Sequence, residues 1–319
     1  RGAVELIDAG GLLWGDLDAR FRKADPLDRP AVGDWVGHRP ISTQPGRTVV
    51  EALVPRRTAF VRRAAGLEAR PQVVAANVDV VFVVTSIDTD FNPRRLERYL
   101  TVVREAGVTP VIVLSKVDRL TSRDEAIAAA RAVGSGARIL ALSNETGEGI
   151  SELLELLGQG VTGALVGSSG VGKSTLVNRI LGDELLATAE TRRDDRGRHT
   201  TTRRELILLP SGGLLMDTPG MREIGLWESD SGLAETFDEV DQLASNCRFR
   251  DCRHRDEPGC AVLAALESGE LSRERYLSHQ KLSAEILATE RRRDPVTAAE
   301  DKQKLKALHR SFKSRPKRR

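Results

Sequence analysis

One octapeptide constrains the fold of this chain more than any other segment. It reads Gly167-Ser168-Ser169-Gly170-Val171-Gly172-Lys173-Ser174, is followed by Thr175, and matches the phosphate-loop pattern G-x-x-x-x-G-K-[ST]. In this pattern backbone N–H groups wrap a polyphosphate at the N-terminus of a helix, where the helix dipole favours anions. An apolar run precedes the motif and a helical pattern over 175–181 follows it. We therefore predict a nucleotide site in which Lys173 reaches the β and γ phosphates and Ser174 holds Mg²⁺.

The sequence around this motif alternates between strand and helix patterns. Its near-continuously apolar runs, each of strand length, cover residues 78–84, 110–114, 138–142 and 163–166. Strands that are buried on both faces of a parallel sheet have this composition. Helical patterns separate the runs, at residues 93–106, 122–133 and 150–157. We therefore predict a doubly wound α/β domain that spans residues 71–226.

A second candidate element for the phosphates, Asp217-Thr218-Pro219-Gly220, follows the apolar run 214–216. A carboxylate at the end of a buried strand can bind Mg²⁺, and the backbone N–H of Gly220 can reach the γ phosphate. Taken alone, the tetrapeptide could be a simple turn. Downstream of a phosphate loop, a nucleotide switch explains it better, and we expect Asp217 to join Ser174 at the Mg²⁺ ion.

Two further segments, each at the end of a predicted strand, indicate that the base is guanine. Ser115-Lys116-Val117-Asp118 ends one strand, and the Asp118 carboxylate can accept hydrogen bonds from the N1–H and N2–H₂ groups that adenine lacks. Lys116 can lie along the base with its methylene stem. Ser143 and Asn144 follow the next strand and can offer backbone N–H groups to the guanine O6. Together these segments predict GTP and GDP as ligands.

The order of these elements is unusual. Guanine-reading segments ordinarily follow the phosphate loop, whereas here residues 115–118 and 143–144 precede it. Joining the old chain ends and opening new ones leaves every strand in place, so the site survives such a rearrangement. We therefore predict a circularly permuted P-loop GTPase domain, whose segment 217–220 leads directly into a cysteine-bearing region.

All three cysteines and one histidine gather in the pattern Cys247-x₄-Cys252-x-His254-x₅-Cys260. Three thiolates and an imidazole form a closed tetrahedral site, so we predict one structural Zn²⁺ ion in a helical domain over residues 227–294. The alternative is a set of buried free thiols. An odd number of cysteines argues for a reducing compartment, and no segment has the apolar length of a membrane span or the pattern of a secretion signal. We expect a cytoplasmic protein.

Residues 1–70 have an all-β pattern. Segments 31–36 and 48–54 predict strands of a small barrel, because they are alternating or apolar and lie between Gly and Pro turns. An arginine cluster around Phe60 is either an RNA-facing edge or an ordinary solvated rim. Its members are Arg56, Arg57, Arg62 and Arg63.

The net charge of +3 comes from the end of the chain. Residues 302–319 carry nine Lys or Arg residues and no acid, which leaves −6 for the remainder. A basic tail over residues 295–319 is either an arm for nucleic acid or an acidic partner, or a solvated, partly helical end.

These motifs resemble those of the bacterial small-ribosomal-subunit-dependent GTPase family, RsgA or YjeQ. The matching segments are Val32-Gly33-Asp34-Trp35, Gly167–Ser174, Gly197-Arg198-His199-Thr200-Thr201-Thr202 and Asp217–Gly220. The resemblance implies an N-terminal OB-fold, a permuted GTPase domain, a zinc domain with the same four ligands, and late maturation of the 30S subunit with 16S rRNA as partner. We expect a monomer. Two positions depart from the family: Ser115 replaces the usual Asn, which removes an amide that would brace the site, and Asn144 stands where Ala is common.

The group that orients the attacking water is the hardest to assign. Ras-like proteins carry a Gln after the switch glycine, and Met221 holds that position here. His199, on the expected first switch loop, is the best replacement, and Lys173 and Thr201 complete the catalytic set. Two alternatives to a GTPase stimulated by the 30S subunit stay open. One is a GTP-gated RNA-binding scaffold, and the other is a permuted GTPase of large-subunit assembly, which the barrel and the cysteine cluster disfavour.

Overall fold

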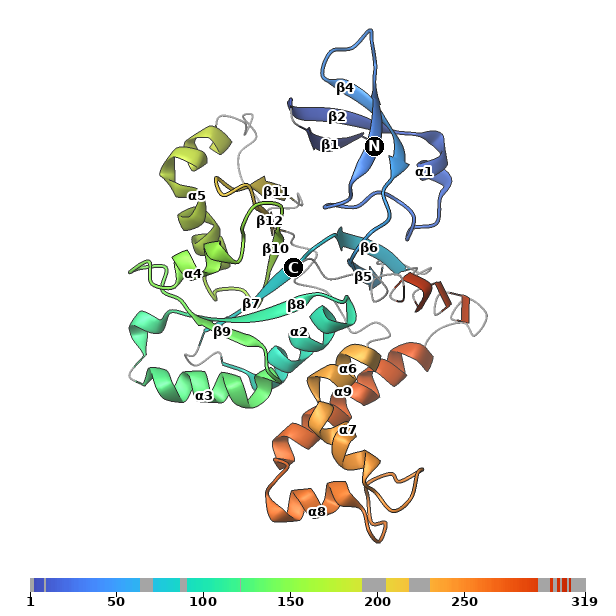
Figure 1. The fold of residues 1–319 in the computed structure, drawn as a ribbon, viewed down its shortest axis with the longest axis vertical. Coiled ribbons are helices and arrows are strands. Elements are labelled where there is room, and N and C mark those ends of the chain that lie inside the picture. Colours follow the sequence, from blue (N-terminus) through green and yellow to red (C-terminus); the bar gives the residue numbers. More distant parts are fainter. Residues whose placement is uncertain are drawn as a thin grey trace.

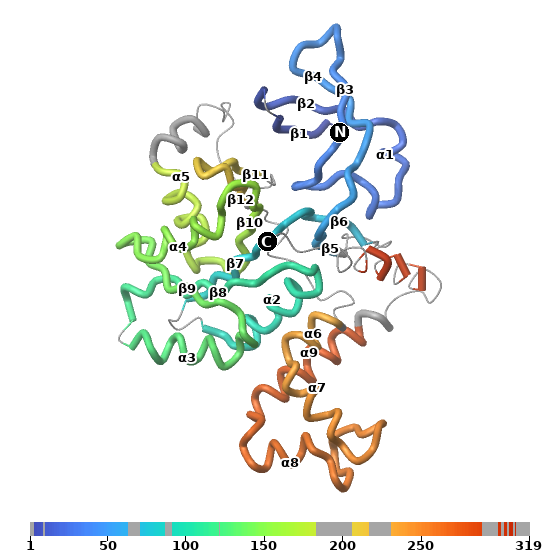
Figure 2. The backbone as a smooth tube through the Cα atoms, in the orientation of Figure 1, coloured from blue at the N-terminus to red at the C-terminus, as the bar shows by residue number. Residues whose placement is uncertain are grey.

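The computed structural model describes residues 3–8, 10–63, 71–86, 91–120, 122–190, 205–217 and 230–291, and also residues 299–300, 303–304, 306–308 and 310. Figure 1 shows N-terminal strands at the top, a sheet with its helices in the middle, and a helical region at the bottom. The tube in Figure 2 follows the same order, from blue strands to orange helices. Within the described residues, no helix combines the length and the apolar character needed to cross a membrane.

Among the described residues, a six-stranded sheet forms the centre of the molecule, in the order β11-β12-β10-β7-β8-β9. Its strands are β7 (Val80–Ser86), β8 (Thr109–Ser115), β9 (Arg138–Ala141), β10 (Thr162–Val166), β11 (Glu205–Leu208) and β12 (Leu214–Asp217). All neighbours are parallel except β11, which runs antiparallel to β12. The four apolar runs are confirmed as β7, β8, β9 and β10, and the sheet is the predicted doubly wound one.

Helices cover both faces of this sheet. They are α2 (Pro93–Glu105), α3 (Arg123–Gly134), α4 (Ile150–Glu155) and α5 (Lys173–Glu190), with a short 3₁₀ turn at Val117–Arg119. Successive side chains of a strand point to opposite faces. In β7, Val81 and Val83 therefore join the core beneath α2 and α3, whereas Phe82 and Val84 join the core beneath α4 and α5. This packing fixes the carboxyl ends of the parallel strands at one edge, where such folds bind ligands.

The described residues of the N-terminal region form two smaller sheets. One contains β1 (Ala3–Asp8), β2 (Gly11–Leu17), β4 (Arg47–Leu53) and β3 (Val36–Pro40), in that order, and the short helix α1 (Ala19–Lys23) follows β2. The other pairs β5 (Ala59–Arg63) with β6 (Pro71–Ala76). The strand predicted at 48–54 is confirmed as β4, and these strands form the barrel-like part of the fold.

The strand predicted at 31–36 is wrong except for its last residue. Gly33 lies in a turn with a left-handed φ of +89°, and a Cβ there would lie 2.1 Å from the carbonyl oxygen of Ala76. The Asp34 carboxylate accepts the backbone N–H of Ala31 at 2.7 Å, which closes the turn. The alternation of apolar and polar residues wrongly predicted a strand here, because the turn depends on a side chain that is distant in the sequence.

That side chain is Arg56, and its burial contradicts both expectations for this member of the arginine cluster, which were an RNA-facing edge or a solvated rim. Its guanidinium donates two hydrogen bonds of 2.8 Å to the carboxylate of Asp34. The side chains of Arg56 and Asp34 are 4% and 1% exposed, and Phe60 belongs to the core. Arg57 is half-buried and pairs with Asp79 at 3.0 Å. Arg56 and Phe60 therefore stabilise the interior of this region and present no surface to RNA.

Four described helices follow the sheet domain. They are α6 (Asp230–Thr236), α7 (Asp238–Ser245), α8 (Ala261–Ser268) and α9 (Arg273–Arg291). Their apolar side chains, among them Phe237, Val262 and Ile286, belong to the same hydrophobic core as the α2 face of the sheet. Figure 1 shows α6 and α9 directly beside α2. The C-terminal helices are therefore packed onto the face of the sheet domain that carries α2.

Part of the basic tail contacts the N-terminal region. Lys304 Nζ lies 2.7 Å from a carboxylate oxygen of Asp25. The Leu308 side chain packs on a small core that includes Leu27, Val61 and Ala76. These two contacts show that the start of the tail covers protein surface, which neither sequence interpretation anticipated.

Candidate functional site

The phosphate-loop motif joins the end of β10 to the start of α5, as its pattern requires. Gly167 has a φ of +143°, and a Cβ there would lie 2.2 Å from the carbonyl oxygen of Val84. Gly172 has a φ of +96°, and a Cβ there would lie 2.8 Å from the amide nitrogen of Asn144. Glycine is therefore needed at both positions for the backbone to curl at the N-terminus of α5, where an anion is favoured.

Lys173 and Ser174 occupy the first turn of α5. Lys173 is buried, and its Nζ donates hydrogen bonds to the carbonyl oxygens of Gly167, at 2.7 Å, and of Ser168. Ser174 is exposed. Asp217 ends β12, which pairs in parallel with β10. The two residues predicted to hold Mg²⁺ therefore come from neighbouring strand ends at one edge of the sheet.

The residues predicted to read guanine lie together on the loops after β8 and β9. The Ser143 hydroxyl donates a 2.5 Å hydrogen bond to Asp118 Oδ1 and accepts the backbone N–H of Glu145 and of Thr146. The hydrogen bond from Ser143 is the main reason that the pKa of Asp118 is lowered from its ordinary value. The carboxylate is thus held ionised, which suits an acceptor for two N–H groups. Lys116 precedes it with a left-handed φ of +61°, at the entry to the 3₁₀ turn.

Ser115 and Asn144, the two departures from the family, tie these loops to the phosphate loop. The buried Ser115 hydroxyl donates to the carbonyl oxygen of Val171 at 2.8 Å. The Asn144 side-chain amide donates to the carbonyl oxygen of Gly172 at 3.0 Å. Two consecutive carbonyl groups of the phosphate loop are therefore held from the base-reading loops. The brace that Ser115 was expected to remove is made here by its hydroxyl and by the Asn144 amide.

Some predicted residues cannot be placed. His199, Thr201, Gly220 and Met221 lie outside the described residues, so their proposed roles stay predictions. The structure brings together three parts of the site, which are the phosphate loop, the base-reading residues and the end of β12.

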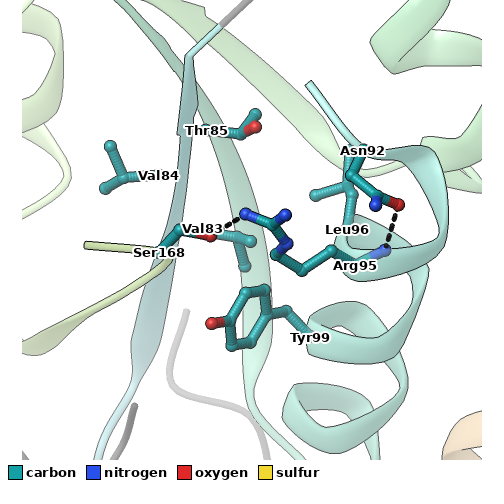
Figure 3. Close-up of a pocket in the computed structure, with 8 residues that line it drawn as sticks. All are labelled: Val83, Val84, Thr85, Asn92, Arg95, Leu96, Tyr99 and Ser168. Carbon is teal, nitrogen blue, oxygen red and sulfur yellow. Dashed lines mark hydrogen bonds between the residues drawn. The ribbon is translucent and has the colours of Figure 1, made fainter. Parts of the chain in front are cut away.

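Arg95 belongs to this site and was not singled out from the sequence. Figure 3 shows its side chain reaching from the first turn of α2 across a hollow to Ser168, with Tyr99 beside it. The guanidinium of Arg95 donates a hydrogen bond to the Ser168 hydroxyl. Nothing in the local pattern separates Arg95 from its neighbour Arg94, because the contact depends on how α2 meets the phosphate loop.

The predicted metal ligands converge in the C-terminal region. The ligand atoms of Cys247, Cys252, His254 and Cys260 all lie within 4.8 Å of one another. Cys247 Sγ is 3.8 Å from Cys260 Sγ and 3.6 Å from His254 Nδ1. Tetrahedral Zn²⁺ with bonds of about 2.3 Å to sulfur separates its ligand atoms by similar distances. The four residues therefore fit a metal ion. A set of buried free thiols, the alternative, would not account for the position of His254 among the three cysteines.

One carboxylate shapes the loop between these ligands. Glu257 accepts the backbone N–H groups of Arg253 and Arg255, each at 2.8 Å. These hydrogen bonds lower the pKa of Glu257 to about 2. His254 lies inside this loop with a left-handed φ of +56°. The loop is thus held in a conformation that presents His254 to the three cysteines.

The sequence of this chain is similar to those of known proteins. Residues 53–227 match the family model described as RsgA GTPase, and residues 162–313 match one described as 50S ribosome-binding GTPase. A relative from Opitutus terrae, called small ribosomal subunit biogenesis GTPase RsgA, is 48% identical and covers 98% of this chain and 88% of its own. A relative of the same name from Syntrophotalea carbinolica is 42% identical with the same two coverages.

Solved structures agree with these relatives. YjeQ from Thermotoga maritima superposes with a TM-score of 0.64 at 28% identity, over 89% of this chain and 94% of that protein. YloQ, described as a circularly permuted GTPase, gives a TM-score of 0.62 at 26% identity, over 91% and 92%. With a family model that covers more than half of the sequence and relatives that match nearly all of it, the chain belongs to the RsgA GTPase family and is a GTP hydrolase with a circularly permuted GTPase domain.

Proposed function

We propose that this GTPase acts in late maturation of the 30S ribosomal subunit and that the subunit stimulates its GTP hydrolysis. The observation that carries the proposal is the similarity to proteins named for small ribosomal subunit biogenesis, which extends over 98% of this chain and so includes the N-terminal strands and the cysteine cluster. The flanking regions are therefore part of what the relatives have in common with it.

Nucleotide binding is assigned to the residues that meet at the sheet edge. The phosphate loop from Gly167 to Thr175 holds the phosphates, and Asp118 pairs with the guanine N1–H and N2–H₂ edge. Ser115, Lys116, Val117, Ser143 and Asn144 position the base-reading loops. Mg²⁺, when bound, would neutralise charge on the β and γ phosphates, and Ser174 and Asp217 would hold it, with Gly220 at the γ phosphate.

Hydrolysis by this chain needs a positioned phosphate and an oriented water. Lys173 would neutralise charge on the γ phosphate, and Thr201 would close the first switch loop over it. His199 would orient the water, since the thioether of Met221 cannot accept or donate a useful hydrogen bond. Free enzyme is then slow, and ordering of the two switch segments by the 30S subunit raises the rate.

The metal cluster is proposed to hold one Zn²⁺ ion in a structural role. Four protein ligands leave no open position for a water or a substrate, which is the usual difference between structural and catalytic zinc. Cys260 Sγ also accepts the backbone N–H of Leu263 at 3.4 Å, so the site fixes the start of α8. The zinc region then serves as a rigid surface toward 16S rRNA.

The N-terminal region is proposed to contact the same RNA, through other residues than the buried Arg56. Trp35 is 62% exposed and Trp14 is 45% exposed. Exposed aromatic rings offer stacking surfaces to unpaired bases. These two tryptophans take the place of the buried Arg56 as candidate RNA contacts of this region.

The test compares GTP hydrolysis alone and with 30S, 50S or 70S particles. Stimulation by 30S particles above the other two supports the proposal, and a partner can add roughly 10³–10⁵-fold to a slow GTPase. Binding to 30S should be tighter with a non-hydrolysable GTP analogue than with GDP. Binding gated by GTP without any stimulation would indicate a scaffold, and stimulation by 50S alone would indicate large-subunit assembly. His199→Ala should lower the stimulated rate and keep the nucleotide-dependent binding.

A further inference from the structure

A small hollow lies between the first turns of α2 and the phosphate loop. Its polar lining comes from Thr85, Asn92, Arg95, Tyr99 and Ser168. Figure 3 shows the guanidinium of Arg95 projecting into this space from the α2 side. The hollow therefore has a cation on one wall and the phosphate loop on the other.

The backbone of Arg95 is fixed by the start of its helix. Its N–H is directed at the carbonyl oxygen of Asn92, at 3.1 Å, and at the Asn92 side-chain oxygen, at 3.2 Å. Pro93 at the start of α2 further restricts the backbone there. The side chain is half-buried, so its origin is rigid while its head faces the hollow.

Arg95 and Lys173 meet at one residue of the phosphate loop. The Arg95 guanidinium donates to the hydroxyl of Ser168, and the Lys173 ammonium donates to the carbonyl oxygen of the same residue. Lysine in this motif reaches the β and γ phosphates of a bound nucleotide. The Arg95 guanidinium therefore contacts the same phosphate-loop residue as the Lys173 ammonium.

The chemistry of the two cations points to one ligand. A guanidinium has a planar, permanently charged fork of N–H donors that matches phosphate oxygens, and in some GTPases an arginine of the same chain stabilises the transition state in this way. The terminal phosphate of GTP is an anion that such a guanidinium can bind.

We propose that Arg95 is a catalytic residue that donates to the γ phosphate of GTP and stabilises the charge that develops there during hydrolysis. The inference rests on the proposed nucleotide site and adds a residue to it. In the step, the water oxygen bonds to the γ phosphorus, and the bond from that phosphorus to the β–γ bridging oxygen breaks. The electron pair goes to GDP, and the water proton leaves with the phosphate product or solvent. Arg95 transfers no proton and acts only as a positive donor.

This role is suited to a chain with Met221 at the usual glutamine position. A water-orienting amide is absent there, so stabilisation of the phosphate charge has to contribute more of the rate. Arg95 supplies it from a rigid helix start, without a partner protein.

The experiment measures single-turnover hydrolysis of GTP by Arg95→Met, Arg95→Lys and the matched control Arg94→Met, with and without 30S particles. Loss of one preorganised donor lowers such rates by about 10²–10³-fold, and we expect this for Arg95→Met. Arg95→Lys keeps the charge and should recover part of the rate. Arg94→Met, one exposed residue earlier on the same turn, should match the wild type.

Binding separates a catalytic role from a structural one. Arg95→Met should bind GDP as the wild type does and lose the extra affinity for GDP with aluminium fluoride, which imitates the phosphoryl group in transfer. Ser168→Ala removes the hydroxyl partner and keeps the cation, so it should lower the rate less than Arg95→Met.

Three results would overturn the proposal. If the wild type hydrolyses GTP and Arg95→Met hydrolyses it at the same rate, the role of Arg95 is wrong and the proposed function is unaffected. Equal losses in Ser168→Ala and Arg95→Met, with GDP binding weakened in both, would make Arg95 a structural tie. A wild type that neither binds nor hydrolyses GTP would reject the proposed function and this inference together.

Discussion

The guanidinium of Arg275 lies 2.8 Å from the carboxylate of Glu97, and the side chains are 9% and 1% exposed. Arg275 belongs to α9 and Glu97 to α2, so this ion pair joins the C-terminal helices to the helix that begins at the nucleotide site. Arg275 also donates to Glu239 and stacks over Phe237, with 4.3 Å to the ring centre. Burial alone would lower the pKa of Arg275, but its hydrogen bonds with Glu239 and Glu97 outweigh it and raise the pKa.

Breaking this ion pair should destabilise the protein strongly. Glu97→Ala removes the buried carboxylate of the pair and leaves Arg275 with only the partly exposed Glu239, so the free energy of unfolding should fall by up to about 3–5 kcal/mol. Urea unfolding of both proteins measures the change. The control is Glu152→Ala, which removes an exposed ion pair with Arg138 at 2.7 Å and should cost less than about 1 kcal/mol. Equal losses in the two variants would contradict the buried role of Glu97.

The Ser115 hydroxyl should contribute measurably to nucleotide affinity. Ser115→Ala leaves the carbonyl oxygen of Val171 without this hydrogen bond, so the phosphate loop of the free protein is less well held in its binding conformation. The cost of ordering it on binding is up to about 1 kcal/mol, or about fivefold in the Kd for both GTP and GDP. Titration of a fluorescent GDP measures it. Ser122→Ala is the control, because the Ser122 side chain makes no capping hydrogen bond at the start of α3. An unchanged Kd in Ser115→Ala would show that the brace does not matter for binding.

Ser143 should set the acid limit of guanine binding. The folded-state pKa of Asp118 lies below its ordinary value of 3.8, chiefly because of the hydrogen bond from Ser143. The stability contributed by the ionised group is therefore present above about pH 4 and is lost as the pH falls through the lowered pKa. Ser143→Ala should raise the pKa of Asp118, as followed by NMR of its carboxyl carbon, and GTP affinity should begin to fall at a higher pH. A pKa unaffected by the substitution would reject this account.

The two functional regions should respond separately to loss of the metal. Cys252→Ser should lose the one zinc per chain found by elemental analysis and expose the 247–268 segment to proteolysis. GTP binding should be largely unchanged, because the phosphate loop lies on the sheet domain. Asp251→Asn, at an exposed neighbour, is the control. Absence of zinc from wild-type protein purified without chelators would contradict the metal assignment.

Guanine specificity should depend on Asp118. Asp118→Asn replaces an acceptor of two hydrogen bonds with an amide, so the affinity for GTP should fall and the preference should shift toward xanthine nucleotides. Competition between GTP, ATP and xanthosine triphosphate for the wild type and the variant measures it. Equal wild-type affinity for ATP and GTP would reject the assignment.

The sheet and the nucleotide loops could be predicted from the sequence because their signals are local. A strand such as Val80–Ser86 is buried on both faces and so is apolar almost throughout, and the phosphate loop requires glycine at positions such as Gly167, where a side chain would strike the neighbouring strand. The cysteine cluster was visible for the same reason, since its four ligands lie within fourteen residues.

The residues that were missed act through contacts between distant segments. Arg56 and Arg95 look like surface arginines in the sequence, and only the packing of Asp34 and Ser168 against them gives each its role. The same holds for Glu97, which is a buried acid on a helix whose sequence pattern is amphipathic. A sequence pattern reports the charge of a side chain, but burial of that charge depends on a partner far along the chain.

The strand order also governs how the domain assembles during synthesis. β7, β8 and β9 are made first and are neighbours in the sheet, so the half that carries both base-reading loops can form early. Until β10 is made, one edge of β7 has no strand beside it, although its residues are buried in the finished sheet. Open edges of this kind pair with other chains. We therefore expect the permuted order to leave this edge open to other chains until residues 162–166 are made, and slow translation of the segment between β7 and β10 to prolong that stage.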